Sequence, residues 1–105
     1  MKELQWDGSS KDDVRAFPLD ARMDAGYQLD KVQRGKDPDK WKPMSTIGPG
    51  VRELILRADS GAFRVLYITN IGDRVHVLHA FQKKTQQTSE QDKRIARARL
   101  KLIKR

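Results

Sequence analysis

Residues 51–82, VRELILRADSGAFRVLYITNIGDRVHVLHAFQ, decide the fold. They contain three runs of β-prone residues, at 51–56, 62–69 and 74–82. Short stretches rich in glycine, aspartate and asparagine separate the runs, as is typical of tight turns between neighbouring strands. The stretch therefore predicts an antiparallel meander of three strands.

The segments around the meander predict helices and one more strand. Ser9 and Ser89 are typical helix caps, Pro18 suits a first helical turn, and Gly35 suits a helix end. In chain order we expect a short strand at 3–6, a helix that begins near Ser9, a helix over 18–34 and a helix over 89–104.

Residues 36–50 hold three of the four prolines and predict an irregular connection, which Trp41 anchors to the core. No linker, repeat or low-complexity tract divides the chain. We therefore expect one α+β domain over residues 1–105, with N-terminal helices and a C-terminal helix packed on a twisted antiparallel sheet.

Positive charge is concentrated at the C-terminal end of the chain. The formal net charge is +8, and residues 83–105 carry nine Lys and Arg against only Glu90 and Asp92. Such a field attracts polyanions. It indicates nucleic acid, an acidic membrane surface or an acidic protein as the partner.

Several classes of protein are poorly supported. The chain has no cysteine, and its apolar runs are too short to span a bilayer or to form a signal peptide. No phosphate-binding glycine loop or acyl-transfer motif is present. His76 and His79 are three residues apart, so on a strand they face opposite sides and cannot easily share a metal. A membrane surface is the weakest of the candidate partners, because the helix over 89–104 has few large apolar residues beyond its core stripe. We expect a cytoplasmic protein with no cofactor, no metal and no membrane partner.

The candidate site consists of cations on the sheet. Arg52, Arg57 and Arg64 lie on or beside the first two strands of the meander, and Lys83 and Lys84 follow the third. In antiparallel hairpins these side chains can converge at one end of the sheet.

Arg64 lies within an apolar run, where a guanidinium is costly to desolvate. Two interpretations stay open: it binds phosphate through its planar fork, or it pairs with Glu53 across the strands. Similarly, Lys83 and Lys84 suit either a phosphate site or a solvated turn.

Two segments together resemble a known family: Gly61-Ala62-Phe63-Arg64-Val65-Leu66-Tyr67 and His79-Ala80-Phe81-Gln82-Lys83-Lys84-Thr85. They are similar to the phage-derived, HigB-like branch of the RelE/ParE toxin superfamily. The resemblance continues at Phe17-Pro18 and at Val51-Arg52-Glu53-Leu54, so it covers nearly the whole chain in the right order.

The resemblance implies a small α+β toxin of a type II toxin–antitoxin system, with helices on a twisted antiparallel sheet. Many members are ribosome-dependent mRNA endonucleases, neutralised by an antitoxin that in this branch is often a helix-turn-helix protein. The resemblance implies active-site roles for Arg64 and the Lys83/Lys84 pair, and a weaker one for Arg57.

The sequence departs from the best-known RelE pattern at three positions. Two strand lysines of that pattern fall near Glu53 and Ile55, and residues 85–105 contain no tyrosine. These departures favour an alternative: a non-catalytic basic module that binds nucleic acid or an antitoxin, such as a degenerate toxin or a phage accessory protein.

If the chain is an enzyme, the chemistry that needs no metal is attack by the RNA 2′-hydroxyl on the adjacent phosphorus. On this hypothesis Arg64 stabilises the developing charge with help from Arg57, Lys83 or Lys84 transfers a proton, and His79 is a reserve base. Further phosphate contacts come from these residues: Arg52, Arg97, Arg99 and Lys101.

Overall fold

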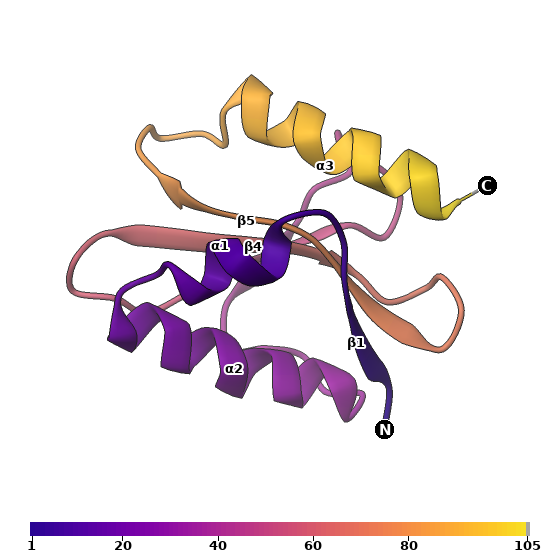
Figure 1. Ribbon diagram of the computed structural model, residues 1–105, viewed down its shortest axis with the longest axis horizontal. Helices are drawn as coiled ribbons and strands as arrows, with labels where there is room; N and C mark the ends of the chain where they lie inside the picture. Colours follow the sequence, from indigo (N-terminus) through magenta and orange to yellow (C-terminus); the bar gives the residue numbers. More distant parts are fainter. Residues whose placement is uncertain (105) are drawn as a thin grey trace.

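The computed structural model describes residues 1–104, which form a five-stranded sheet with helices on both faces (Figure 1). The elements in chain order are β1 (Glu3–Trp6), α1 (Ser10–Arg15), α2 (Leu19–Gln33), β2 (Trp41–Pro43), β3 (Arg52–Ile55), β4 (Ala62–Ile68), β5 (Arg74–Lys83) and α3 (Glu90–Ile103). The expected α+β class is confirmed.

The predicted meander forms the centre of the sheet, whose strand order is β1-β5-β4-β3-β2. Strands β2 to β5 pair in antiparallel fashion, and β1 adds to the β5 edge in parallel. Between β1 and β5 the chain forms α1, α2 and three other strands. It then returns so that β5 lies beside β1 and runs in the same direction.

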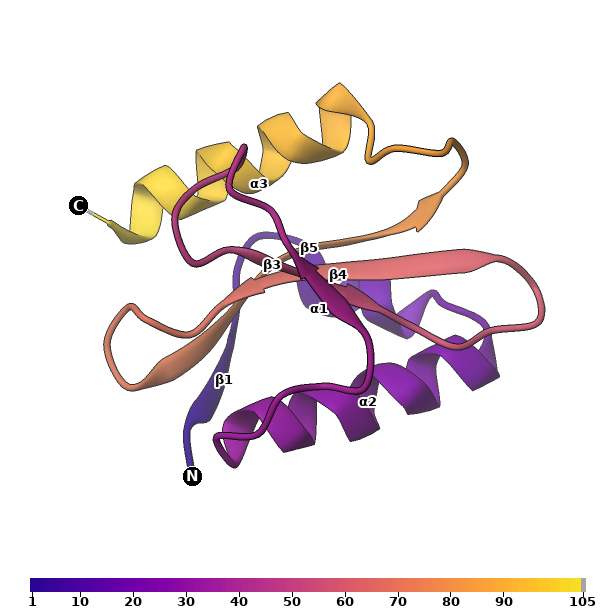
Figure 2. The ribbon, with the colours of Figure 1, turned by 180° about the vertical axis from the view of Figure 1, so that it is seen from behind.

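The sheet separates two cores, as Figures 1 and 2 show from opposite sides. Helices α1 and α2 cover one face, where Ala21, Ala25 and Leu29 pack on Val65 and Tyr67. Helix α3 covers the other face, where Ala96 and Leu100 pack on residues of β4 and β5. All these apolar side chains are at most 4% exposed, so helix-on-sheet burial is the main favourable contribution to folding.

The segment 36–50 is less irregular than predicted. Trp41, Lys42 and Pro43 form β2 and pair with Leu54, Glu53 and Arg52 of β3. Proline is tolerated because β2 is the edge strand, where one side of the backbone needs no partner. This strand brings Lys42 beside Glu53.

A β-bulge corrects the prediction for the two histidines. His79 lies opposite Leu66, yet Val77 lies opposite Tyr67, so Leu78 is an extra residue in β5. Because of this extra residue, His76 and His79 both pair with β4 residues that belong to the α3-side core, Ile68 and Leu66. They therefore share a face of the sheet.

The helix ends lie close to where the sequence predicts them. Helix α2 begins at Leu19, so Pro18 is its N-cap instead of a residue of its first turn. Gly35 follows the end of α2 with a φ of +81°, a conformation that favours glycine. No helix within residues 1–104 is long and apolar enough to cross a membrane.

Candidate functional site

The candidate site is a cluster of cations around one fully buried carboxylate, that of Glu53 on β3. The Nζ of Lys42 and the Nε of Arg64 each lie 3.5 Å from Glu53 Oε1. The hydroxyl of Thr88, just before α3, donates a hydrogen bond to Glu53 Oε2. We call Lys42, Glu53, Arg64 and Lys83 the cation cluster.

Sheet register explains why these side chains meet. Lys42 is the direct partner of Glu53 across β2 and β3, and Arg64 is the partner of Ile55, two residues further along β3. Residues two apart on a strand share a face, so Arg64 lies diagonal to Glu53 and on the same side. Leu66, which is opposite Glu53, belongs to the α3-side core, so the cluster lies on the α3 face.

Lys83 completes the cluster from the end of β5, where it pairs with Ala62 of β4. Burial lowers the pKa of Lys83, and the positive charges of Lys42 and Arg64 lower it further. The negative charge of Glu53 acts in the opposite direction. Two cations, Lys42 and Arg64, contact the carboxylate, and Lys83 is the third cation nearby, which leaves the cluster with a net positive charge.

The structure confirms the ion-pair interpretation of Arg64, and the phosphate-binding interpretation stays a prediction. Its side chain is 14% exposed and contacts Glu53, as the ion-pair interpretation predicts. However, its Nη1 donates only to the neighbouring backbone carbonyl of Phe63, at 2.9 Å, and Lys42 shares the same carboxylate oxygen. The carboxylate positions the guanidinium without neutralising the whole cluster.

Two hollows open beside the cluster, and Gln87 lines both of them. A hollow of about 180 Å³ is lined by Lys83, Lys84 and Asp92, together with residues of the segment between β5 and α3. A second, of about 310 Å³, is lined by Lys42, Thr88 and the segment that follows β2. Each of the two hollows therefore has a lysine of the cluster in its wall, while Lys84 is exposed at the rim of the first.

His79 lies on the α3 face but is engaged in structure. Its Nε2 is 2.7 Å from Asp92 Oδ1 on α3, and its ring stacks on Phe81 with 5.3 Å between centroids. Its side chain is 8% exposed, and its Nδ1 is buried with no hydrogen-bond partner in residues 1–104. This arrangement ties α3 to β5 and does not bring His79 into contact with the cation cluster.

Arg52 and Arg57 do not join the cluster. Arg52 pairs with Asp37 at 3.0 Å and stacks on Trp41 with 3.8 Å to the ring centroid. Its register partner Tyr67 belongs to the α2-side core, so Arg52 is on the opposite face from Arg64. Arg57 lines a hollow on the α2 side whose walls include Asp20, Asp24 and Asp59.

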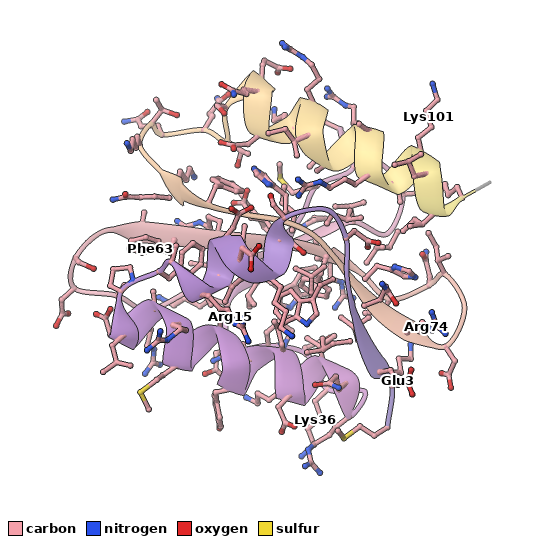
Figure 3. The ribbon with its side chains drawn as sticks, viewed as in Figure 1. Glu3, Arg15, Lys36, Phe63, Arg74 and Lys101 are labelled. Atoms are coloured by element: carbon pink, nitrogen blue, oxygen red, sulfur yellow. The ribbon has the colours of Figure 1, made fainter. Side chains whose placement is uncertain are left out.

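The three predicted cations of α3 differ in their surroundings. Arg99 donates to the Leu78 carbonyl at 2.8 Å and to Ser9 Oγ at 3.1 Å, so it joins α3 to β5 and α1. Arg97 donates to the Thr46 carbonyl at 3.0 Å. Lys101 is exposed and points away from the sheet, as Figure 3 shows. Among these three, Lys101 is the side chain best placed to meet a polyanion.

Sequence reasoning missed Lys42 and the central position of Glu53. Lys42 lies between Trp41 and Pro43, in a stretch whose prolines indicate a loop. The signal that could have found Lys42 is Glu53 itself, a carboxylate next to Leu54 on the adjacent strand. A carboxylate on the buried first strand of a meander needs cationic partners on both flanks.

Chemically, the cluster suits a phosphodiester. A guanidinium and two ammonium groups can contact the non-bridging oxygens and stabilise negative charge that develops on them. The lowered pKa of Lys83 makes its ammonium a stronger acid than an ordinary lysine. Among residues 1–104 no group of three His, Asp or Glu is placed to hold a metal ion.

Comparison with known proteins identifies one relationship. The model of a protein family described as "Phage derived protein Gp49-like (DUF891)" matches residues 12–101. The match includes all of α2, most of α3 and every member of the cation cluster. No curated protein matches the chain.

Proposed function

The chain belongs to the Gp49-like family of phage-derived proteins, a family of RelE/ParE-like toxins, and on this basis we propose that it is a toxin that cleaves mRNA on the ribosome. The family implies an antitoxin as partner. We propose further that the chain acts as a single HigB-like toxin domain in the cytoplasm, where ribosomes are found, and that its antitoxin is a helix-turn-helix protein.

One observation carries this proposal: Lys42 and Arg64, from two strands, contact a single buried carboxylate, and Lys83, from a third strand, lies close enough for their charges to lower its pKa. Placing like charges close together costs free energy, so the protein needs a favourable interaction that offsets the repulsion. A polyanionic substrate gives a reason, because a bound phosphate offsets the repulsion. The open hollows beside the cluster give the flanking nucleotides a place to lie.

In the proposed reaction the 2′-oxygen of the RNA forms a bond to the adjacent phosphorus, and the bond from phosphorus to the 5′-oxygen breaks. Arg64 and Lys42 hold the non-bridging oxygens and stabilise their negative charge. The 2′-hydroxyl proton passes to water, and the Lys83 ammonium donates a proton to the departing 5′-oxygen. The products are a 2′,3′-cyclic phosphate and a 5′-hydroxyl end.

The test is cleavage of mRNA in a translation extract, mapped by primer extension. The purified wild-type protein should cut the message, and Arg64→Ala should lower the rate by at least about 100-fold, as expected for loss of a charge-stabilising group. Arg57→Ala is the matched control, because Arg57 lies on the other side of the sheet, and it should leave the rate within about threefold of wild type.

Circular dichroism shows whether Arg64→Ala folds, and Arg64→Lys provides a second variant that keeps a charge beside Glu53. Full cleavage by a folded Arg64→Ala protein would contradict the proposal.

A non-catalytic binding module is the second candidate. The feature that favours it is the absence of tyrosine from residues 85–105, so no phenol is available there for proton transfer. On this alternative the wild-type protein binds RNA in a salt-dependent manner but leaves the message intact on the ribosome.

A further inference from the structure

The outward side of α2 carries three large apolar side chains that are mostly exposed, with the Lys31 ammonium 5.5 Å from the centroid of the Tyr27 ring. Leu19, Met23 and Tyr27 are 60%, 66% and 60% exposed. They are four residues apart, so they form one stripe along the helix. In residues 1–104 the other large apolar side chains with such exposure, Met1 and Leu102, lie on different elements.

This stripe belongs to neither core, because α2 buries a different face. Ala21, Ala25, Leu29 and Val32 pack into the α2-side core and are at most 5% exposed. A helix that is apolar on both sides is typical of one with neighbours on both sides. The outward stripe lacks such a neighbour within residues 1–104.

Gly26 lies beside the stripe, on the exposed side of α2. It has no positive φ, and a Cβ added to it would meet nothing within 4 Å. Glycine in a helix interior costs about 0.5–1 kcal/mol relative to alanine, and neither turn geometry nor crowding within the chain requires it here. A second backbone that approaches closely at this point would require it.

Next to the stripe, carboxylates line a hollow of about 420 Å³ between α2 and the segment after β3. Asp20 and Asp24 accept hydrogen bonds from the backbone N–H groups of Asp59 and Arg57, at 2.9 and 2.8 Å, which fixes the wall of the hollow. Three carboxylates, Asp20, Asp24 and Asp59, face one cation, Arg57. Lys31 beside Tyr27 is paired with Asp39, so the walls of the hollow keep an excess of negative charge, which on a chain of net charge +8 indicates a ligand of opposite charge.

This surface is separate from the cation cluster. Helices α2 and α3 lie on opposite faces of the sheet, as Figures 1 and 2 show, and the register of β3 and β4 places the cluster on the α3 face. A ligand on α2 therefore leaves the cluster and its two hollows open.

We propose that the outward face of α2, formed by Leu19, Met23, Gly26 and Tyr27 with Asp20, Asp24 and Asp59, is the docking surface for a basic amphipathic helix of a partner protein. Apolar side chains of the partner cover Met23 and Tyr27, its backbone approaches Gly26, and its Lys or Arg side chains contact the carboxylates. The partner holds the chain by the face opposite the cluster. The proposal is independent of whether the cluster cleaves RNA.

The probe is a synthetic helical peptide with leucine at every third and fourth position and Lys and Arg on the flanks. Titrated into the full chain at low salt, it should bind and perturb the NMR signals of Met23 and Tyr27. A control peptide with the same leucines and glutamate flanks should bind at least about tenfold more weakly, because it faces like charges. Absence of binding by the basic peptide at millimolar concentration overturns the proposal.

Variants locate the binding surface. Met23→Lys and Tyr27→Lys together should weaken binding of the basic peptide at least about tenfold by removing apolar contact and adding like charge. The matched control is Leu102→Lys, which changes an equally exposed apolar residue on α3 and should leave binding unchanged. An equal fall in affinity in both proteins would show unspecific apolar association and overturn the proposal.

Gly26→Ala separates docking from stability. Since space for a Cβ is open, this substitution should raise the melting temperature of the free chain. It should nevertheless weaken binding of the basic peptide severalfold, because the added methyl group holds the two backbones apart. Unchanged or tighter binding by Gly26→Ala would overturn the close approach that the proposal requires.

Discussion

The carboxylate of Glu53 is buried completely, yet it contacts Lys42 and Arg64 and accepts a hydrogen bond from Thr88. A buried charge is tolerated only when it is paired and hydrogen-bonded. Glu53 meets this condition in part: Lys42 and Arg64 pair with it from both neighbouring strands and Thr88 donates to Oε2, while Oε1 has no hydrogen-bond partner within residues 1–104. We propose that Glu53 positions the cations that would contact the phosphate.

Replacing Glu53 with glutamine tests this role. Because the charge of Glu53 raises the pKa of Lys83, Glu53→Gln should lower the pKa of Lys83 further. Side-chain NMR of isotopically labelled lysine measures this directly and requires no activity. An unchanged Lys83 titration would show that the two groups do not interact, and that the cluster is not a unit.

The lowered pKa of Lys83 has a consequence for stability. The unfolded chain holds the Lys83 proton up to its ordinary pKa of 10.5, whereas the folded chain releases it at lower pH. The contribution of Lys83 therefore becomes more favourable as pH rises from the lowered pKa through 10.5.

Lys83→Met should consequently stabilise the protein at pH 7, by less than about 1 kcal/mol because the side chain is only partly buried. The gain should shrink at pH values above the ordinary lysine pKa of 10.5. Urea unfolding at both pH values checks the sign. A gain that grows with pH would contradict the direction of the shift.

At the scale of elements, α3 is attached to the sheet by polar contacts as well as by its apolar stripe. Arg99 is the main example, because its two donor nitrogens reach the bulged Leu78 of β5 and Ser9 before α1. Ser89 caps the first turn by accepting from the backbone N–H of Asp92 at 3.1 Å. Since the segment before α3 lines both hollows, these contacts fix the edge of the candidate site.

Arg99→Ala should destabilise the protein by about 1–3 kcal/mol, because a partly buried carbonyl is deprived of a charged donor. Lys101→Ala, two residues along the same helix but exposed, should change stability by less than about 0.5 kcal/mol. Urea denaturation of both variants gives the comparison. Equal effects would mean that Arg99 is only a surface charge.

Ser89→Ala should cost about 1 kcal/mol, the typical value for loss of an N-cap side chain. Ser60→Ala, in the turn between β3 and β4, is the matched control and should have little effect. Hydrogen exchange should show faster opening of the first turn of α3 in Ser89→Ala alone. Protection equal to that of the wild type would contradict the importance of this cap.

The elements differ in how well the sequence predicts them. Strong periodicity and turn residues were enough to predict the meander and all three helices. The prolines around Trp41 concealed β2, because an edge strand tolerates proline and looks like a loop in sequence. The bulge at Leu78 was also hidden, because an extra residue in a strand changes which side chains share a face without changing the composition.

The sequence identifies only some members of the cation cluster, because strand pairing decides which side chains meet. Arg64 and Lys83 could be selected as cations on the strands, and the structure brings them together. Arg52 and Arg57 could not be separated from them by sequence, because their faces depend on register and on where β3 ends. Lys42 depended on the concealed strand.

At the scale of the whole molecule, charge and exposure differ between the two faces of the sheet. The α3 face carries the cation cluster and most of the C-terminal excess of Lys and Arg. The α2 face carries an exposed apolar stripe with carboxylates beside it. If both proposals hold, this division lets one small chain present a polyanion-binding face and a protein-binding face at once.

The long-range part of RNA attraction should depend on exposed cations of α3. Lys101→Glu should weaken association with RNA at low salt, and the slope of log affinity against log salt should become shallower by about one unit for each phosphate that is no longer neutralised. Fluorescence anisotropy with a labelled oligonucleotide over a salt series provides the measurement. An unchanged slope would remove α3 from the interface.

The central claim is that Lys42, Arg64 and Lys83 act as one phosphate-binding site. Lys42 is the decisive member, because only the folded structure assigns it to the cluster. The most direct measurement is the rate of mRNA cleavage on the ribosome by Lys42→Ala beside Lys40→Ala, an exposed lysine that lines a hollow on the α2 side. We predict that Lys42→Ala lowers the rate at least about tenfold while Lys40→Ala keeps the wild-type rate. Equal rates for the two variants would contradict the site.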